Sequence, residues 1–302
     1  MAGRTVGQND SLVRLIATDL DGTLLRSDRQ TVSQRSRAAL AAARDAGITI
    51  VLVSARGPVG VAEVADAAGC DGLAICSNGA LIFDLASSEV VRHRPLAAEV
   101  AAQMIRALRA RLPDVCFATE TGGVFALEPA FEGAWEWEPP AGTRYGDALE
   151  LVASPVTKLI ARDATCSIAD LAAAARDIAA QNASVAVSGE WVIEISAAGV
   201  NKAAALQEIA ADLGVLRADV VAFGDYPNDL PMLRWAGLSI APANAHLDVL
   251  VEVDEVTESN DNDGVAVAIE RLLRECEGVD PSSSNDVRPR NRPHQDARVQ
   301  HR

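Results

Sequence analysis

A short apolar run that ends in two acids constrains the fold of this chain more than any other feature. Residues 13–18 read Val-Arg-Leu-Ile-Ala-Thr, and Asp19-Leu-Asp21-Gly-Thr follows directly. A run of branched apolar side chains that stops at a Gly-Thr turn is typical of a buried strand. In open α/β sheets, ligands bind beyond the carboxyl ends of the strands. We therefore expect Asp19 and Asp21 at a ligand site, where a hard divalent cation would offset the repulsion between their carboxylates.

The same pattern of apolar run and helix recurs along the chain. Continuous apolar runs lie at residues 48–53, 73–76 and 220–223, as expected of strands that are buried on both faces of a parallel sheet. Helix-forming stretches at residues 33–46, 58–68 and 202–213 separate them or precede them. This β-α-β order predicts the α/β class, with a doubly wound, Rossmann-like parallel-sheet core.

The middle of the chain follows a different pattern. Residues 83–197 contain two hairpin-like strand pairs, each with a helix, at residues 97–111 and 167–181, and a Pro- and Gly-containing loop at 129–147. We interpret this section as an α+β cap domain inserted into a core made of residues 12–82 and 198–278. The polar ends, residues 1–11 and 279–302, are predicted to be a flexible N-terminus and a disordered tail.

Composition excludes several classes of partner. The formal net charge of −15 argues against a nucleic-acid partner, because a phosphate backbone would be repelled. No segment approaches the roughly 20 apolar residues of a membrane helix, and the first residues lack the apolar core of a secretory signal, so we expect a cytoplasmic protein with no membrane partner. Five cysteines without a Cys-x-x-Cys pair indicate reduced thiols rather than disulfides or zinc.

Polar residues also follow the later apolar runs. Ser54 follows the second run, Asp225, Asn228 and Asp229 follow the last, and Lys202 begins a predicted helix just before it. Because the carboxyl ends of parallel strands share one edge of the sheet, these groups are expected to meet near the first two acids. Carboxylates, a hydroxyl, an amide and an ammonium together suit a phosphate ester held by Mg²⁺.

This set of groups predicts covalent phosphoryl transfer. Asp19 would attack phosphorus and form an aspartyl-phosphate, while Asp21 would protonate the departing oxygen and then accept a proton from water. Lys202, with the donors of Ser54 and Asn228, would offset charge on the transferring group.

Mg²⁺ prefers six oxygen ligands in near-octahedral order. The carboxylates of Asp19 and Asp225, the main-chain carbonyl of Asp21, a phosphate oxygen and waters would supply them. We expect Asp229 to orient a metal-bound water or Lys202 rather than to bind the metal.

Taken together, these motifs resemble those of the haloacid dehalogenase superfamily hydrolases, of the Cof-type branch with an α/β cap (type IIB). The likeness spans about residues 12–273 and rests on these matches: Asp19-Leu-Asp21-Gly-Thr23, Ser54, Lys202, Gly224-Asp225, Asn228-Asp229, Asn78-Gly-Ala and Asp263-Gly-Val-Ala. The resemblance implies a Mg²⁺-dependent phosphatase of small phosphorylated metabolites, often sugar phosphates, with the cap closing over the substrate.

The resemblance also implies further roles, and two departures bear on them. Ser54, Ala55 and Arg56 stand where relatives often have Thr-Gly-Arg, which implies a phosphate-binding loop narrowed by a methyl group. Arg56 either touches substrate or pairs with an acid. Asn78 and Thr23 are expected to hold the residues of the site in place without touching the phosphate or the metal. The other departure is Tyr226-Pro227, bulkier than the small residues common there.

Other functions stay open at this point. A phosphomutase would use the same nucleophile but return the phosphoryl group to sugar, and a phospho-ligand-binding regulator would not turn over. The chain has no Gly-x-Gly-x-x-Gly after the first strand and no P-loop motif, which argues against a nucleotide-binding dehydrogenase and against a P-loop protein. The sequence leaves both monomer and homodimer open.

Overall fold

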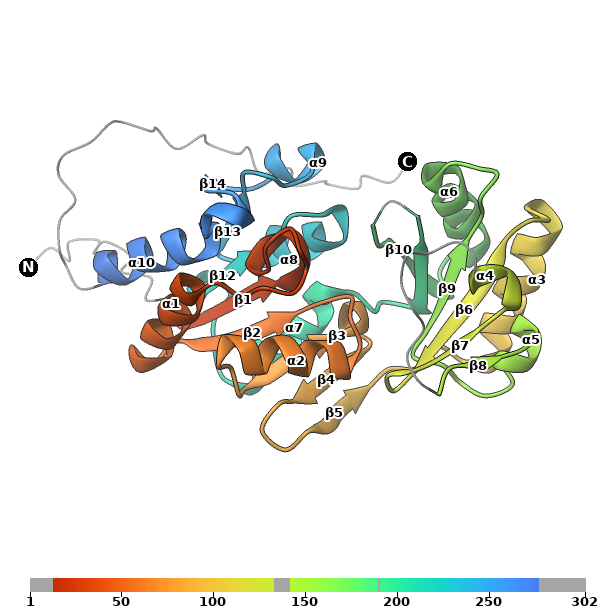
Figure 1. Cartoon of the computed structure of the whole chain (residues 1–302), viewed down its shortest axis with the longest axis horizontal. Helices are drawn as coiled ribbons and strands as arrows, with labels where there is room; N and C mark the ends of the chain where they lie inside the picture. The colour runs from red at the N-terminus through yellow and green to blue at the C-terminus, as the bar shows by residue number, and fades with distance from the viewer. Residues whose placement is uncertain (1–12, 133–141, 190, 277–302) are drawn as a thin grey trace, which may run out of the picture.

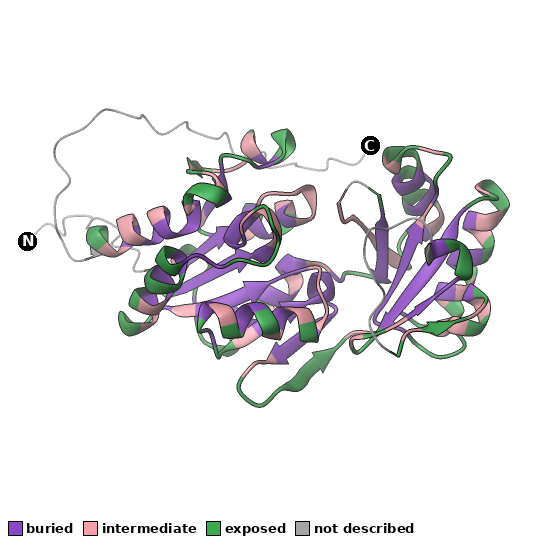
Figure 2. Ribbon diagram, viewed as in Figure 1, coloured by how far each residue is buried: buried purple, intermediate pink, exposed green. Residues whose placement is uncertain are grey.

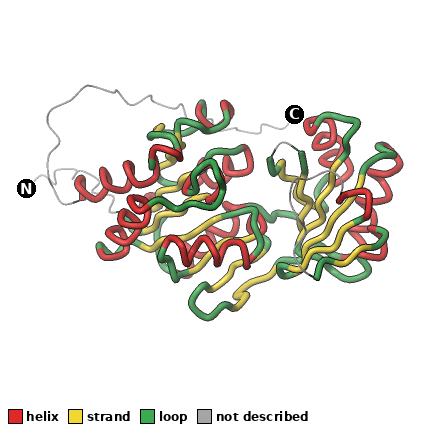
Figure 3. Tube along the Cα trace, in the orientation of Figure 1, coloured by secondary structure: helices red, strands yellow, loops and turns green. Residues whose placement is uncertain are grey.

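Two sheets organise the computed structural model, which describes residues 13–132, 142–189 and 191–276 (Figure 1). In the described residues, eight strands form one sheet in the order β14-β13-β12-β1-β2-β3-β4-β5, and six form another in the order β10-β11-β9-β6-β7-β8. Helices flank both sheets (Figure 3). The α/β class is confirmed. The predictions for residues 1–11 and 279–302 fall outside the described residues.

The larger sheet is parallel from β14 to β3 and antiparallel at β4 and β5. Its strands are β1 (Leu15–Asp19), β2 (Thr49–Val53), β3 (Leu73–Cys76), β4 (Leu81–Asp84), β5 (Glu89–His93), β12 (Val220–Phe223), β13 (Leu238–Pro242) and β14 (Glu255–Thr257). The continuous apolar runs of β1, β2 and β12 are buried, as expected of strands covered on both faces (Figure 2).

Helices cover the larger sheet on both faces. On one side lie α1 (Gln34–Asp45), α2 (Pro58–Ala68) and α10 (Gly264–Cys276); on the other lie α7 (Lys202–Asp212), α8 (Leu230–Trp235) and α9 (Leu247–Leu250). Alternation along β1 serves both layers, because Ile16 packs with the first group and Leu15 and Ala17 with the second. This is the predicted doubly wound core.

The smaller sheet is the cap. It contains β6 (Cys116–Thr121), β7 (Val124–Leu127), β8 (Arg144–Tyr145), β9 (Lys158–Arg162), β10 (Ala183–Val187) and β11 (Ile193–Ala197). The helices α3 (Ala98–Arg111) and α6 (Ile168–Ala179) pack on its face away from the larger sheet (Figure 1). The short helix α4 (Pro129–Glu132) and the strand β8 lie within the stretch 129–147 that was predicted to be a loop, and the short helix α5 (Ala148–Leu151) follows it directly.

The predicted boundary of the cap at residue 83 is wrong. Strand β4 pairs with β3 and β5 pairs with β4, so the larger sheet continues through His93 before the chain crosses to the cap. A hairpin pattern predicts strand pairing but does not say which sheet receives the pair. Within the described residues, no helix is long and apolar enough to cross a membrane.

Candidate active site

Lys202 lies at the centre of the site. It is the first residue of α7, whose start is fixed because the Asn201 side chain accepts a hydrogen bond from the N–H of Ala204. The Nζ of Lys202 donates to Oδ1 of Asp19 at 2.5 Å and to Oδ1 of Asp229 at 2.6 Å. Only 1% of the surface of Lys202 is exposed, so its ammonium is stabilised by the two carboxylates and not by solvent water.

The loop after β12 is organised by Asp229. Its Oδ2 accepts hydrogen bonds from the N–H groups of Asp225 and Tyr226, at 3.1 and 3.0 Å. Thr23, from the turn η1 (Leu20–Leu24), donates its hydroxyl to Oδ1 of Asp225 at 2.8 Å. Two segments about 200 residues apart are therefore tied together, as the parallel sheet predicts.

Three carboxylates converge at this edge of the sheet. Asp19, Asp225 and Asp229 each offer an oxygen, and these atoms lie within 4.8 Å of one another. Clustered carboxylate oxygens suit a hard dication such as Mg²⁺. Asp19 and Asp225 are predicted ligands; Asp229 was expected only to orient other groups, and its oxygens already bond Lys202 and the loop amides.

Burial and crowding perturb the ionisable groups of the cluster. Burial raises the pKa of Asp19 well above its usual value; Lys202 opposes the rise, and Asp229 and Asp225 add to it. Burial and the neighbouring Asp229 raise the pKa of Asp225 to about 7. Burial alone would lower the pKa of Lys202, but Asp19 and Asp229 outweigh it and raise the pKa. The ammonium therefore stays charged, and the acids gain from a further cation.

Asp21 faces a different partner. The guanidinium of Arg56 holds its carboxylate with two hydrogen bonds, from Nε at 2.8 Å and from Nη2 at 2.6 Å, and also donates to the carbonyl of Arg29. Both side chains are about one-third exposed at the rim of the site. Of the two roles considered for Arg56, the structure contains the pairing with an acid.

Ser54, Ala55 and Arg56 form a tight loop after β2. The buried hydroxyl of Ser54 accepts a hydrogen bond from the N–H of Arg56 at 3.1 Å and keeps its own proton to donate. The side-chain amide of Asn228 donates a hydrogen bond to Oδ1 of Asn78 at 3.0 Å. Asn78 thus ties the loop after β12 to the turn after β3.

Three buried charged residues of the cap were not predicted, and one of them, Lys158, contacts this loop. Lys158, Glu120 and Glu194 lie on neighbouring strands, and the Nζ of Lys158 donates to the carbonyl of Ala55 at 2.8 Å. A signal existed in the sequence: Lys158 and Lys202 are the two lysines of a chain with 25 arginines.

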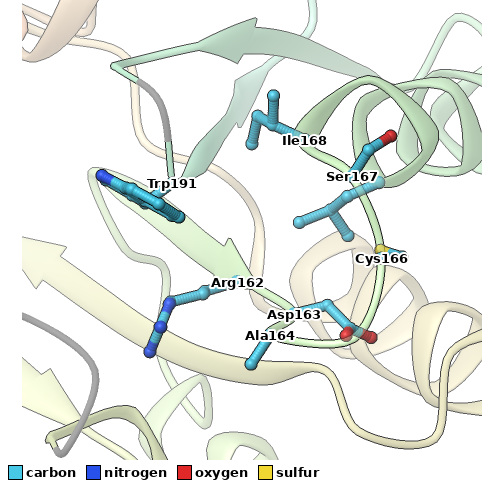
Figure 4. Close-up of a pocket in the computed structure, with 8 residues that line it drawn as sticks. Arg162, Asp163, Ala164, Cys166, Ser167, Ile168 and Trp191 are labelled. Carbon is cyan, nitrogen blue, oxygen red and sulfur yellow. The ribbon is translucent and has the colours of Figure 1, made fainter.

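Two cavities lie near or within the cap. One, of about 270 Å³, lies between cap and core and is lined by Asn78, Glu194, Lys202 and Asn228, among others. The other, of about 190 Å³, is lined by cap residues that include Arg162, Asp163 and Trp191 (Figure 4). Trp191 is 69% exposed there, and no predicted site residue is among those that line this cavity.

Comparison with known proteins agrees with this geometry. A family model for haloacid dehalogenase-like hydrolases matches residues 16–269. The 5-amino-6-(5-phospho-D-ribitylamino)uracil phosphatase YcsE of Bacillus subtilis (strain 168) is 30% identical over 268 residues, covering 88% of this chain and 98% of that protein.

Solved structures show the same architecture. BT1666 from Bacteroides thetaiotaomicron, studied among phosphatases of the superfamily, has a TM-score of 0.76 at 26% identity, covering 90% of this chain and 99% of its own. The subclass IIB sugar phosphatase BT4131 has a TM-score of 0.75 at 20% identity, covering 86% and 99%, and so shares the fold. The chain belongs to the haloacid dehalogenase-like hydrolases, with the core and cap arrangement of the Cof type.

Proposed function

We propose that this protein is a Mg²⁺-dependent phosphatase that hydrolyses a small phosphorylated metabolite, such as a sugar phosphate or a similar phosphomonoester. The observation that carries the proposal is the buried Lys202 ammonium bridging Asp19 and Asp229, with Asp225 beside them. The similarity to YcsE and BT1666, both described as phosphatases, supports it.

Asp19 is proposed as the nucleophile. One of its carboxylate oxygens would form a bond to phosphorus as the ester P–O bond breaks, which gives an aspartyl-phosphate. Water would then attack phosphorus, release inorganic phosphate and restore the carboxylate. Lys202 would hold the Asp19 carboxylate in line and offset charge on the phosphoryl oxygens, since its Nζ already lies at Oδ1 of Asp19.

Asp21 is proposed as the general acid and base. It would give a proton to the departing ester oxygen in the first step and accept one from the attacking water in the second. Two hydrogen bonds from Arg56 orient its carboxylate. Ser54, Ala55, Arg56 and Asn228 are proposed to bind the phosphate, with the Ser54 hydroxyl as a donor.

Asp19 and Asp225, with the main-chain carbonyl of Asp21, are proposed to hold Mg²⁺. The ion would supply positive charge beside the nucleophile and the phosphoryl oxygens. Thr23 would orient the Asp225 carboxylate, and Asp229 would position Lys202 and the loop after β12.

The leaving group is proposed to occupy space between cap and core. The cavity of about 270 Å³ is lined by amide, hydroxyl and charged groups and, in similar measure, by valine, alanine and proline side chains, which suits an organic group with both polar and apolar faces, such as a sugar. This places the specificity for the metabolite largely in the cap.

The test is a screen of phosphate release, with and without Mg²⁺, over sugar phosphates, nucleotides and cofactor phosphates. The proposal predicts Mg²⁺-dependent release from at least one class. Isomerised sugar phosphate without free phosphate would instead indicate a phosphomutase. Binding without any turnover of the bound ester would indicate a phospho-ligand-binding protein.

A further inference from the structure

The two lysines of the chain occupy matching environments on opposite sides of the cap–core boundary. All 25 other cationic side chains of the Lys/Arg type are arginines. Lys202 is buried between two carboxylates in the core, and Lys158, 3% exposed, is buried between two carboxylates in the cap. An ammonium is compact and directs its three donors separately, which a planar guanidinium cannot do. Lys158 therefore occupies a site that demands three separate contacts.

The three contacts of Lys158 join the cap to the core. Its Nζ lies 2.7 Å from Oε1 of Glu194 and 3.2 Å from Oε2 of Glu120, both in the cap. The third contact, at 2.8 Å, is to the carbonyl of Ala55 in the proposed phosphate-binding loop. Burial alone would lower the pKa of Lys158, but Glu194 and Glu120 raise it, so the ammonium is charged. We call Lys158, Glu120 and Glu194 the cap triad.

The carboxylates of the cap triad hold a second core segment. The Ser77 hydroxyl donates to Oε1 of Glu120 at 3.0 Å, and the Asn78 amide donates to Oε2 of Glu194 at 2.6 Å. These residues belong to the turn η2 (Ser77–Gly79), in which Ser77 and Asn78 have positive φ angles of 49° and 55°. Successive side-chain-bearing residues with positive φ angles are strained, and such a conformation persists only where neighbouring groups hold it.

The turn η2 passes this constraint to the catalytic groups. A Cβ on Gly79, whose φ is 98°, would lie 2.3 Å from the carbonyl oxygen of Asn201, so the turn rests directly on the start of the helix that carries Lys202. Asn78 also accepts a hydrogen bond from Asn228 in the loop after β12. The cap triad thus reaches the loop after β2, the loop after β12 and the start of α7 through one or two contacts each.

We infer that Lys158, Glu120 and Glu194 are positioning residues, which fix the phosphate-binding loop and the turn η2 so that the catalytic site is complete only with the cap docked. The inference rests on the proposed function. The cap then has a second role besides selecting the substrate by its leaving group. The hydrogen bonds and ion pairs of the cap triad do not involve the leaving group, so this role is the same for every substrate.

The first test uses Lys158→Met combined with Glu194→Gln. The pair removes one positive and one negative charge, so the triad keeps its net charge of −1. Positioning predicts that kcat falls by the same factor, about 10- to 100-fold, for p-nitrophenyl phosphate, an alkyl phosphate and a sugar phosphate. A loss confined to one leaving group, or rates within twofold of wild type, would overturn the inference.

The second test displaces the triad without altering its charges. In Gly57→Ala, the new Cβ would lie 2.5 Å from Oε1 of Glu120 and would push that carboxylate from Ser77, while Gly57 itself has an ordinary φ of −74°. Gly72→Ala is the matched control, since its Cβ makes only ordinary contact at 3.5 Å. Labelling with an amine-reactive ester, followed by mass spectrometry, reports each lysine separately.

In Gly57→Ala, Lys158 is expected to react with the ester at least about tenfold faster than in the wild type or in Gly72→Ala, while the rate at Lys202 stays unchanged. The kcat of Gly57→Ala should fall by the same factor on all three phosphate esters. Unchanged Lys158 labelling together with wild-type kcat would refute the role of the triad. If the wild-type protein hydrolyses no phosphate ester with Mg²⁺, the proposed function fails and this inference falls with it. If the wild type is active and both variants match it, the inference alone fails.

Discussion

The Nζ of Lys202 lies 2.5 Å from Oδ1 of Asp19, although 183 residues separate them in sequence. The strand β1 delivers Asp19 to the carboxyl edge of the sheet, and α7 returns to that edge only after the chain has formed the whole cap. The proposed nucleophile and the cation beside it are thus supplied by the two halves of a core that the cap interrupts.

Replacing Lys202 should cost stability as well as activity. Lys202→Met leaves Asp19 and Asp229 buried without their shared cation, and breaking a buried pair in this way costs about 3–5 kcal/mol. Urea unfolding monitored by circular dichroism, in EDTA, measures the free energy of unfolding. Arg35→Met is the control, since it removes a half-exposed pair with Glu270 that is worth about 0–1 kcal/mol. Equal losses in the two variants would contradict the description of Lys202.

Replacing Asp21 should affect substrates according to their leaving groups. Asp21→Asn keeps the shape but removes the proton that the departing oxygen needs, so kcat on an alkyl phosphate should fall by about 10²–10⁴-fold and much less on p-nitrophenyl phosphate. Steady-state kinetics on both esters gives the two ratios. Asp71→Asn, at an exposed pair with Arg44, should leave both rates unchanged. An equal loss on both esters would argue against the acid role.

Removing the metal should make stability depend on pH in a defined direction. Because the pKa of Asp225 rises from 3.8 to about 7, the folded chain retains a proton that the unfolded chain releases, so metal-free stability falls as pH rises through this window. Mg²⁺ requires the carboxylate, and its affinity should therefore weaken below pH 7. The gain in Tm from Mg²⁺ over EDTA should be larger at pH 8 than at pH 6. A gain independent of pH would contradict Asp225 as a ligand.

Much of the core was predictable because its signals are local. The strand β12 and the helix α2 have the predicted bounds, and Lys202 begins its helix as expected. The convergence of Asp19, Lys202, Asp225 and Asp229 followed from one rule about parallel sheets. These predictions required no knowledge of the cap.

Contacts between cap and core were not predictable in the same way. Glu120, Lys158 and Glu194 lie on three strands whose order is set by antiparallel pairing, and nothing local in their sequence indicates that their side chains face the core. The strands β4 and β5 were wrongly assigned to the cap for the same reason, because a hairpin pattern in the sequence does not show which sheet the two strands join. Arg56 offered two partners in sequence, and only the fold shows it beside Asp21.

The central claim is that Asp19 becomes phosphorylated during turnover. Acid quenching of the wild-type enzyme with a ³²P-labelled phosphate ester and Mg²⁺, followed by digestion and mass spectrometry, should find one hydroxylamine-sensitive phosphoryl group on the peptide that contains Asp19. Asp19→Asn should fold, carry no label and lose at least about 10³-fold in kcat. Label on another residue, or an Asp19→Asn variant that keeps a tenth of wild-type turnover, would contradict the account.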